Sequence, residues 1–233
     1  MKIASKRSGV KLTRKTKPFP STSDVQLNET SSHLFDCALT LFSEKGYDAT
    51  SVRDIIQAAG VTQPTLYYYC DGKQDLFLML VRKTYENSLK ELQEAINVES
   101  TCESRLRAIA TVSFAGCAAD IRVPKLMFQT AFGPPITGVT ETMNELGGQR
   151  FAIVRNVIRL GMKSGELANS DADGVSLAFC CLLDQHINVL VRLPNWKKLL
   201  TPKMAIWLVS LFLDGATILH MARNEVKMLS TEQ

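Results

Sequence analysis

Apolar residues recur along most of this chain at the spacing of one turn of an α-helix. The first stripe ends before Gly46 and consists of Leu34, Phe35, Ala38, Leu41 and Phe42. A later stripe keeps the same period from Leu76 to Ile96, which predicts one long helix that begins at Lys73. A helix of this length suits a connection between two parts of a protein.

Five further helices are predicted from the same periodicity and from their Pro and Gly boundaries. They cover residues 103–120, 124–132, 141–163, 171–193 and 201–223. No segment alternates apolar and polar residues convincingly, as a half-buried strand would, and no internal repeat is present. The predicted fold class is therefore all-α.

The segment TSVRDIIQAAG is short and has clear helix boundaries. Ser51 and Asp54 have the spacing of a capping box, and Gly60 stands where a helix end favours a residue without a Cβ. Thr62 is then a good N-cap for the following helix, and Pro64 falls in its first turn, where the missing N–H costs little. A helix, a short turn containing Gly and a second helix form the outline of a helix-turn-helix.

The predicted last helix, residues 201–223, is apolar nearly all round. Its segment MAIWLVSLFLDGATIL is interrupted only by Ser210, Asp214 and Thr217. Such a helix needs cover on every side. A position at the centre of a monomeric core would supply that cover, but contact with a second subunit is the favoured interpretation.

Charge is distributed unevenly along the chain, although the net charge is only +4. Residues 1–17 contain seven Lys or Arg and no acidic residue, so the remainder is mildly acidic. Residues 1–27 are poor in apolar side chains and are predicted to form a disordered basic arm. Such an arm either attracts phosphate groups or keeps the chain soluble, and the sequence leaves both roles open.

The six cysteines show no C-x-x-C spacing, and we interpret them as reduced thiols of a cytoplasmic protein. No stretch reaches about 18 apolar residues, so no membrane span is expected. Cys180, Cys181 and His186 suggest a metal site, but adjacent cysteines point apart on a helix and no second Cys/His cluster accompanies them. No metal and no cofactor are therefore expected.

The stretch ALTLFSEKGYDATSVRDIIQAAGVTQPTLYYYCDGKQDLF resembles the DNA-binding domain of the tetracycline-repressor (TetR/AcrR) family of transcription regulators. Its first part, LFSEKGYDATSVRDI, is similar to the family's first helix, loop and second helix. The second part, AAGVTQPTLYYYCDGKQDLF, is similar to the turn, the recognition helix and the start of the fourth helix. Beyond this stretch the resemblance is only in outline, in GMKSGEL and LFLDGA.

This resemblance implies an all-helical homodimer with a DNA-binding domain at 28–75, a ligand-binding and dimerisation domain at 76–225 and a tail at 226–233. The helices at 171–193 and 201–223 would form a four-helix bundle with those of the second subunit. The implied protein is a repressor at the bacterial nucleoid. It binds a palindromic operator in double-stranded DNA and is released by a small apolar or aromatic effector. Activation instead of repression stays open.

Eight residues are predicted to contact DNA. Gln63 can pair with an adenine edge, and the Thr65 methyl or the Pro64 ring can pack on a thymine methyl. Lys73, at the start of a helix, is expected to bind phosphate. The full set implied by the resemblance is Arg53, Thr62, Gln63, Pro64, Thr65, Tyr67, Tyr69 and Lys73.

The three consecutive tyrosines are assigned different roles, with Leu66 and Cys70 facing inward. The hydroxyls of Tyr67 and Tyr69 are expected to donate to phosphates, which positions a protein on DNA without reading its sequence. Tyr68 is expected to pack at the rim of the small domain. Ordinary packing of all three rings is the alternative.

The resemblance does not identify the effector. Phe114, Met127, Phe128 and Phe132 are candidates to line an apolar pocket, with His186 as a polar contact, although such residues are more often simple core.

Two other functional classes compete with a ligand-responsive regulator. An enzyme is disfavoured, because the chain has only three histidines and no G-x-S-x-G, P-loop or H-E-x-x-H sequence. An architectural DNA-binding protein would bind without sequence preference, whereas Gln63 and Arg53 predict that bases are read.

Overall fold

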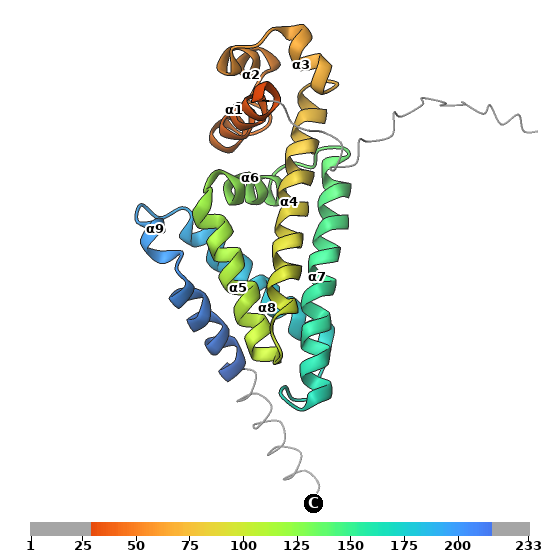
Figure 1. The fold of residues 1–233 in the computed structure, drawn as a ribbon, viewed down its shortest axis with the longest axis vertical. Helices are drawn as coiled ribbons and strands as arrows, with labels where there is room; N and C mark the ends of the chain where they lie inside the picture. The colour runs from red at the N-terminus through yellow and green to blue at the C-terminus, as the bar shows by residue number, and fades with distance from the viewer. Residues whose placement is uncertain (1–28, 216–233) are drawn as a thin grey trace, which may run out of the picture.

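The computed structural model describes residues 29–215, and within that range the chain consists only of helices and their connections (Figure 1). The prediction of an all-α fold is confirmed. The predicted arm over residues 1–27 and the tail over 226–233 lie outside the described residues. The elements are α1 (Glu29–Lys45), α2 (Val52–Ala59), α3 (Gln63–Tyr69), α4 (Lys73–Asn97), α5 (Cys102–Ala119), α6 (Arg122–Phe132), α7 (Val139–Ser164), α8 (Ala172–Leu190), α9 (Trp196–Leu199) and a helical segment over residues 202–215.

Helices α1, α2 and α3 gather at one end of the molecule, and α4 runs from this group into the remaining helices (Figure 1). Their buried side chains form a first core, in which the rings of Phe42 and Phe77 meet edge to face with centroids 4.9 Å apart. Leu126 of α6 and Val139 of α7 also belong to this core. The C-terminal half of the chain therefore completes the packing of the N-terminal helices.

A second core is built from α4, α5, α7, α8 and the segment over residues 202–215. Leu92 and Ile96, near the end of α4, are buried in it, and Phe114 of α5 is fully buried in it as well. Helix α4 thus supplies its first turns to one core and its last turns to the other.

Some helix boundaries depart from the predicted ones. Helix α6 begins at Arg122, ahead of Pro124, because a proline is tolerated in the first turn of a helix. Helix α8 ends at Leu190, and the short helix α9 follows where the pattern predicted none. The end of the predicted last helix lies beyond the described residues.

Gly161 of α7 marks a very close approach to the start of α5. A Cβ at this position would lie 2.5 Å from the Sγ and 2.6 Å from the Cβ of Cys102. Gly148 lies in the same helix, but it is exposed and a Cβ there would meet nothing within 4 Å. Only the first of these glycines is required by packing.

We expect Gly161→Ala to lower the free energy of unfolding by about 1–3 kcal/mol, because the added methyl group overpacks the contact between α5 and α7. The matched change Gly148→Ala should raise it by about 0.5–1 kcal/mol, since alanine favours a helix more than glycine does. Chemical denaturation of both variants measures the two effects. Effects of the same sign and size would contradict the close approach.

Candidate nucleic-acid interface and effector cavity

Helices α2 and α3 both begin at side-chain caps. The Ser51 N–H donates to Asp54 Oδ2 at 2.9 Å, and the Asp54 N–H donates to Ser51 Oγ at 3.1 Å, which completes the predicted capping box. The hydrogen bonds from Ser51 lower the pKa of the Asp54 carboxyl. Thr62 starts α3 by accepting from the Thr65 N–H at 3.3 Å. Each cap fixes the residue at which its helix begins.

Gly60 turns the chain between these two helices. Its φ of 61° and ψ of 26° lie in the left-handed region that glycine adopts most readily. The Val61 N–H donates to the Ile56 carbonyl oxygen at 3.2 Å and closes the end of α2. The helix-turn-helix predicted from the sequence is present.

The outer face of α3 carries a group of exposed side chains. Gln63, Pro64 and Tyr67 are exposed, and Thr65 is half-buried. Thr62 is exposed as well, and its hydroxyl lies 2.8 Å from the Thr65 hydroxyl. The structure therefore brings the predicted contact residues of α3 onto one surface, where the hydroxyls of the two threonines are hydrogen-bonded to each other.

The tyrosines are arranged differently from the prediction. Tyr68 was expected to pack, but it is 82% exposed, so that expectation is wrong. Tyr69 instead packs against the first core and meets the Tyr68 ring edge to face, with centroids 5.0 Å apart. Successive helical residues point about 100° apart, so burial of Leu66 and Cys70 directs Tyr68 to the opposite side. The Cys70 thiol is buried, as predicted, and burial raises its pKa.

Lys73 attaches the start of α4 to the connection between α1 and α2. Its Nζ donates to the Tyr47 carbonyl oxygen at 2.9 Å and lies 4.1 Å from the centroid of the Tyr47 ring. An ammonium group has three donors, so one bond to the protein leaves others for a phosphate. Arg53 is exposed on α2.

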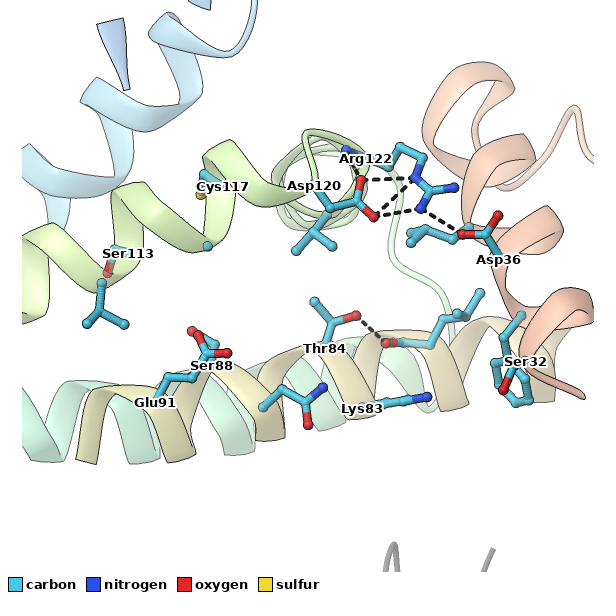
Figure 2. Close-up of a pocket in the computed structure, with 17 residues that line it drawn as sticks. Ser32, Asp36, Lys83, Thr84, Ser88, Glu91, Ser113, Cys117, Asp120 and Arg122 are labelled. Atoms are coloured by element: carbon cyan, nitrogen blue, oxygen red, sulfur yellow. Dashed lines mark hydrogen bonds and ion pairs between the residues drawn. The ribbon is translucent and has the colours of Figure 1, made fainter. Parts of the chain in front are cut away.

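Arg122, at the start of α6, ties the C-terminal half of the chain to α1. Its guanidinium lies 2.7 Å from Asp36 Oδ1, and it donates to both carboxylate oxygens of Asp120 (Figure 2). It also donates to the Thr40 hydroxyl. The hydrogen bonds from Arg122 lower the pKa of the Asp120 carboxyl. We call these four residues the Arg122 clamp.

A cavity of about 380 Å³ opens between α1, α4, α5 and α6, beside the clamp (Figure 2). We call it the junction cavity. Helix α5 contributes Ser113, Gly116 and Cys117 to its wall. A polar stripe of α4 also lines it, and this stripe consists of Lys83, Thr84, Asn87, Ser88 and Glu91.

A second cavity, of about 210 Å³, lies between α4, α5, α6, α7 and α8, and we call it the apolar cavity. Arg150 and Asp184 line it and are joined by two hydrogen bonds, one of them 2.8 Å long between Nη1 and Oδ1. Its apolar lining includes Val123, Pro124, Met127, Phe128, Ala131, Phe132, Met143 and Ile187.

The structure brings together only some of the predicted effector contacts. Phe114 does not line either cavity, because it is fully buried in the second core. His186 does not line them either, and its ring lies beside that of Trp207, with centroids 6.3 Å apart. The predicted residues that do line the apolar cavity are Met127, Phe128 and Phe132.

Sequence reasoning missed the polar residues of both cavities. The pairs Arg150–Asp184 and Arg122–Asp36 join residues that are far apart in the chain, and helical periodicity does not indicate which charged residues meet. Ser88 was visible only as a polar residue within the long predicted helix. In the sequence, such a residue is only a polar position on a regular helix. Polar positions are common on solvent-exposed faces, so they do not indicate a cavity.

Cys180 and Cys181 face different surroundings, as expected for neighbours on a helix. Cys180 is buried, which raises its pKa to about 11, whereas Cys181 is exposed.

Within residues 29–215, no three side chains of the metal-binding types come together as a possible ion site. In the same part of the chain, no helix combines the length and the apolar character needed to cross a membrane.

Comparisons with known proteins give a consistent result. Residues 34–80 match the family model of bacterial regulatory proteins of the tetR family. Over 154 residues the chain is 29% identical to the HTH-type transcriptional repressor KstR2 of Rhodococcus jostii, which covers 66% of this chain and 74% of that protein. Over 134 residues it is 23% identical to the fatty acid metabolism regulator protein of Bacillus subtilis, which covers 58% and 69%.

The fold is also found in a solved structure. The transcriptional regulator FadR from Bacillus subtilis, in complex with stearoyl-CoA, superposes with a TM-score of 0.69 and 20% sequence identity. The superposition covers 79% of this chain and 98% of that one.

We expect the Arg122 clamp to give a measurable coupling between α1 and α6. A double-mutant cycle of Arg122→Ala and Asp36→Asn should yield about 0.5–1 kcal/mol in the free energy of unfolding, because the pair is only partly exposed. Chemical denaturation measures the cycle. Lys125→Ala, at an exposed position of the same helix, is the control and should not couple with Asp36→Asn.

The same variants should show a defined pH dependence. Because the pKa of Asp120 is lowered in the folded state, its stabilisation is present above the ordinary carboxyl pKa of about 3.9 and is lost as the pH falls through the folded value. The difference in stability between the unmodified protein and Arg122→Ala should therefore shrink in acid. A difference that stays constant would indicate that Arg122 acts through packing alone.

Proposed function

The chain belongs to the tetR family of bacterial regulatory proteins, and we propose that it is a cytoplasmic homodimeric repressor that an apolar or amphipathic molecule releases from a near-palindromic DNA site. As a member of this family it is a DNA-binding transcription regulator and not an enzyme. The observation that supports this proposal most strongly is the position of α4, which connects the N-terminal helices to both cavities. Lys73 in its first turn contacts the connection between α1 and α2, and its middle turns line both cavities. A molecule in either cavity must therefore touch the helix that positions α3.

Helix α3 is proposed to read bases in the major groove. Gln63 would pair with an adenine edge, and Pro64 and Thr65 would pack on thymine methyl groups. Two copies related by a two-fold axis would place their α3 helices about 34–36 Å apart on the DNA, or a multiple of that distance. The remaining proposed contacts, to the DNA backbone or a neighbouring base edge, are Arg53, Thr62, Tyr67, Tyr69 and Lys73.

A second copy of the chain is proposed to cover an apolar face on α8 and residues 202–215. The contact of the His186 and Trp207 rings supports the view that these two helices lie side by side. A group of large exposed apolar side chains is typical of an interaction surface. We call this group the dimer face, and its members are Leu177, Val189, Ile206, Trp207 and Leu211.

The apolar cavity is proposed to take the apolar part of the effector. The stearoyl-CoA bound to FadR supports an effector with a long apolar chain, and the name of KstR2 supports repression. Occupation would press on α4 and on the Arg122 clamp, so that the two α3 helices no longer fit their grooves together. A coupling of about 1–3 kcal/mol between effector and DNA is typical of such regulators.

Selection of bound duplexes from a random DNA pool tests the proposed DNA recognition. We expect a near-palindromic consensus, and Gln63→Ala should relax it at one symmetric position, with a loss of about 1–3 kcal/mol in discrimination there. Gln57→Ala, an exposed glutamine of α2 outside the proposed contact set, is the matched control. Enrichment of no consensus would favour an architectural role, and a reporter gene behind the selected site would distinguish repression from activation.

The reactivity of Cys181 tests the proposed dimer. This exposed thiol lies one helical turn from Leu177, so a second copy should shield it from alkylation. Leu177→Glu should weaken self-association by at least about tenfold and speed the labelling of Cys181, because it brings charge into the dimer face. Sedimentation measures the first effect, and mass spectrometry of alkylated protein measures the second.

The control for this experiment is Val98→Glu. Val98 is 83% exposed at the end of α4, outside the dimer face, so the same charge there should change neither measurement. Fast labelling of Cys181 at every protein concentration in the unmodified protein would contradict the proposed interface.

A further inference from the structure

The junction cavity carries more negative than positive charge. Its lining contains the carboxylates of Asp36, Glu91 and Asp120 and the cations of Lys83 and Arg122. Arg122 is already occupied, because the two aspartates and a hydroxyl accept from its guanidinium. Lys83 is therefore the one cation of this described lining that is available to a ligand.

Between Lys83 and Glu91, the α4 stripe offers neutral hydrogen-bonding groups. The Asn87 amide and the Ser88 hydroxyl line the cavity, and within residues 29–215 neither side chain hydrogen-bonds to another residue. On α5, Ser113 lines the cavity (Figure 2). Its hydroxyl donates to the Ile109 carbonyl oxygen at 2.8 Å and can still accept. The cavity thus presents donors and acceptors with little available positive charge.

The junction cavity adjoins the apolar cavity, so one molecule can occupy both. The two cavities share part of their lining, on α4, α5 and the start of α6. The shared residues are Thr84, Ser88, Ser113, Cys117 and Val123.

We propose that the effector is an amphiphile with an apolar chain and an uncharged head group that donates and accepts hydrogen bonds, as an alcohol, a glycerol ester or an amide does. The inference rests on the proposed function and adds the chemical class of the head. The apolar cavity holds the chain, and the junction cavity holds the head beside Asn87 and Ser88. A polyanionic head, such as the phosphates of coenzyme A, would meet the carboxylate of Glu91, which forms no ion pair within residues 29–215, the ion pairs of the Arg122 clamp, and a single available lysine. One lysine cannot balance several phosphate charges, and like charges in contact disfavour binding.

The test uses three probes that share a dodecanoyl chain: 1-monododecanoylglycerol, dodecanoate and dodecanoyl-CoA. Each is added below its aggregation concentration to the full-length protein. Calorimetry measures binding, and fluorescence anisotropy of a labelled DNA site measures release. The glycerol ester is expected to bind at least about tenfold more tightly than the coenzyme A ester.

A pair of matched variants separates the charge of the cavity from the charge of the whole molecule. Glu91→Lys places a second available cation in the junction cavity and should shift the preference toward the coenzyme A ester by about tenfold or more. Glu94→Lys changes an exposed residue of the same helix that lines neither cavity. It makes the same change in net charge and should leave the preference unaltered.

The outcomes distinguish the head-group assignment from the proposed function. Preference of the unmodified protein for either charged probe, or equal shifts in Glu91→Lys and Glu94→Lys, overturns the assignment of an uncharged head. The proposed function still stands in that case if one of the probes releases DNA. If no probe binds although the protein binds its DNA site, both the assignment and the proposed chain-binding role of the apolar cavity are overturned.

Discussion

One helix belongs to both hydrophobic cores, and this sharing constrains the rest of the molecule. Leu76 and Phe77 of α4 are buried in the first core, and Leu92 and Ile96 are buried in the second. A continuously hydrogen-bonded helix bends only gently without a proline or an inserted group, so its two ends cannot move independently. The polar stripe of α4 falls on the turns between the two cores. Polar side chains are tolerated there because those turns face open cavities.

A second connection between the halves of the chain is electrostatic. The Arg122 clamp joins α6 to α1, and a hydrogen bond of 3.1 Å from Gln129 to the Ser43 carbonyl oxygen reinforces it. Ion pairs and hydrogen bonds of this kind can open without exposing a large apolar area. Helix α4, in contrast, cannot separate from either core without exposing buried apolar side chains to water. Helix α6 also places Leu126 in the first core, so opening of the clamp alone does not release α6 from α1.

The features predicted correctly from the sequence are local ones. The capping box at Ser51, the turn at Gly60 and the period of α4 all depend on neighbours in the chain, so short-range patterns were sufficient. The orientation of Tyr68 was also within reach, because an inward Leu66 leaves it on the outer side of α3. The prediction failed there because the helical rotation was not applied to all three tyrosines.

The cavities depend on how distant helices meet, and no periodicity carries that information. Phe114 and Phe128 look alike in the sequence, yet one is fully buried in a core and the other lines the apolar cavity. The difference follows from which face of each helix its neighbours cover. The half-buried pair of Arg150 and Asp184 could not be predicted for the same reason, since its partners come from α7 and α8. The net charge of a cavity cannot be predicted until the fold shows which distant residues line it.

The first core is not complete without Leu126 and Val139, which come from α6 and α7. This has a consequence for recombination between related regulators. A chimera that joined α1 to α4 of this chain to the C-terminal helices of another would have an unfilled space, unless those helices supplied side chains of similar volume at these two positions. Exchange of C-terminal halves, in evolution or by design, is therefore limited by the fit of two side chains.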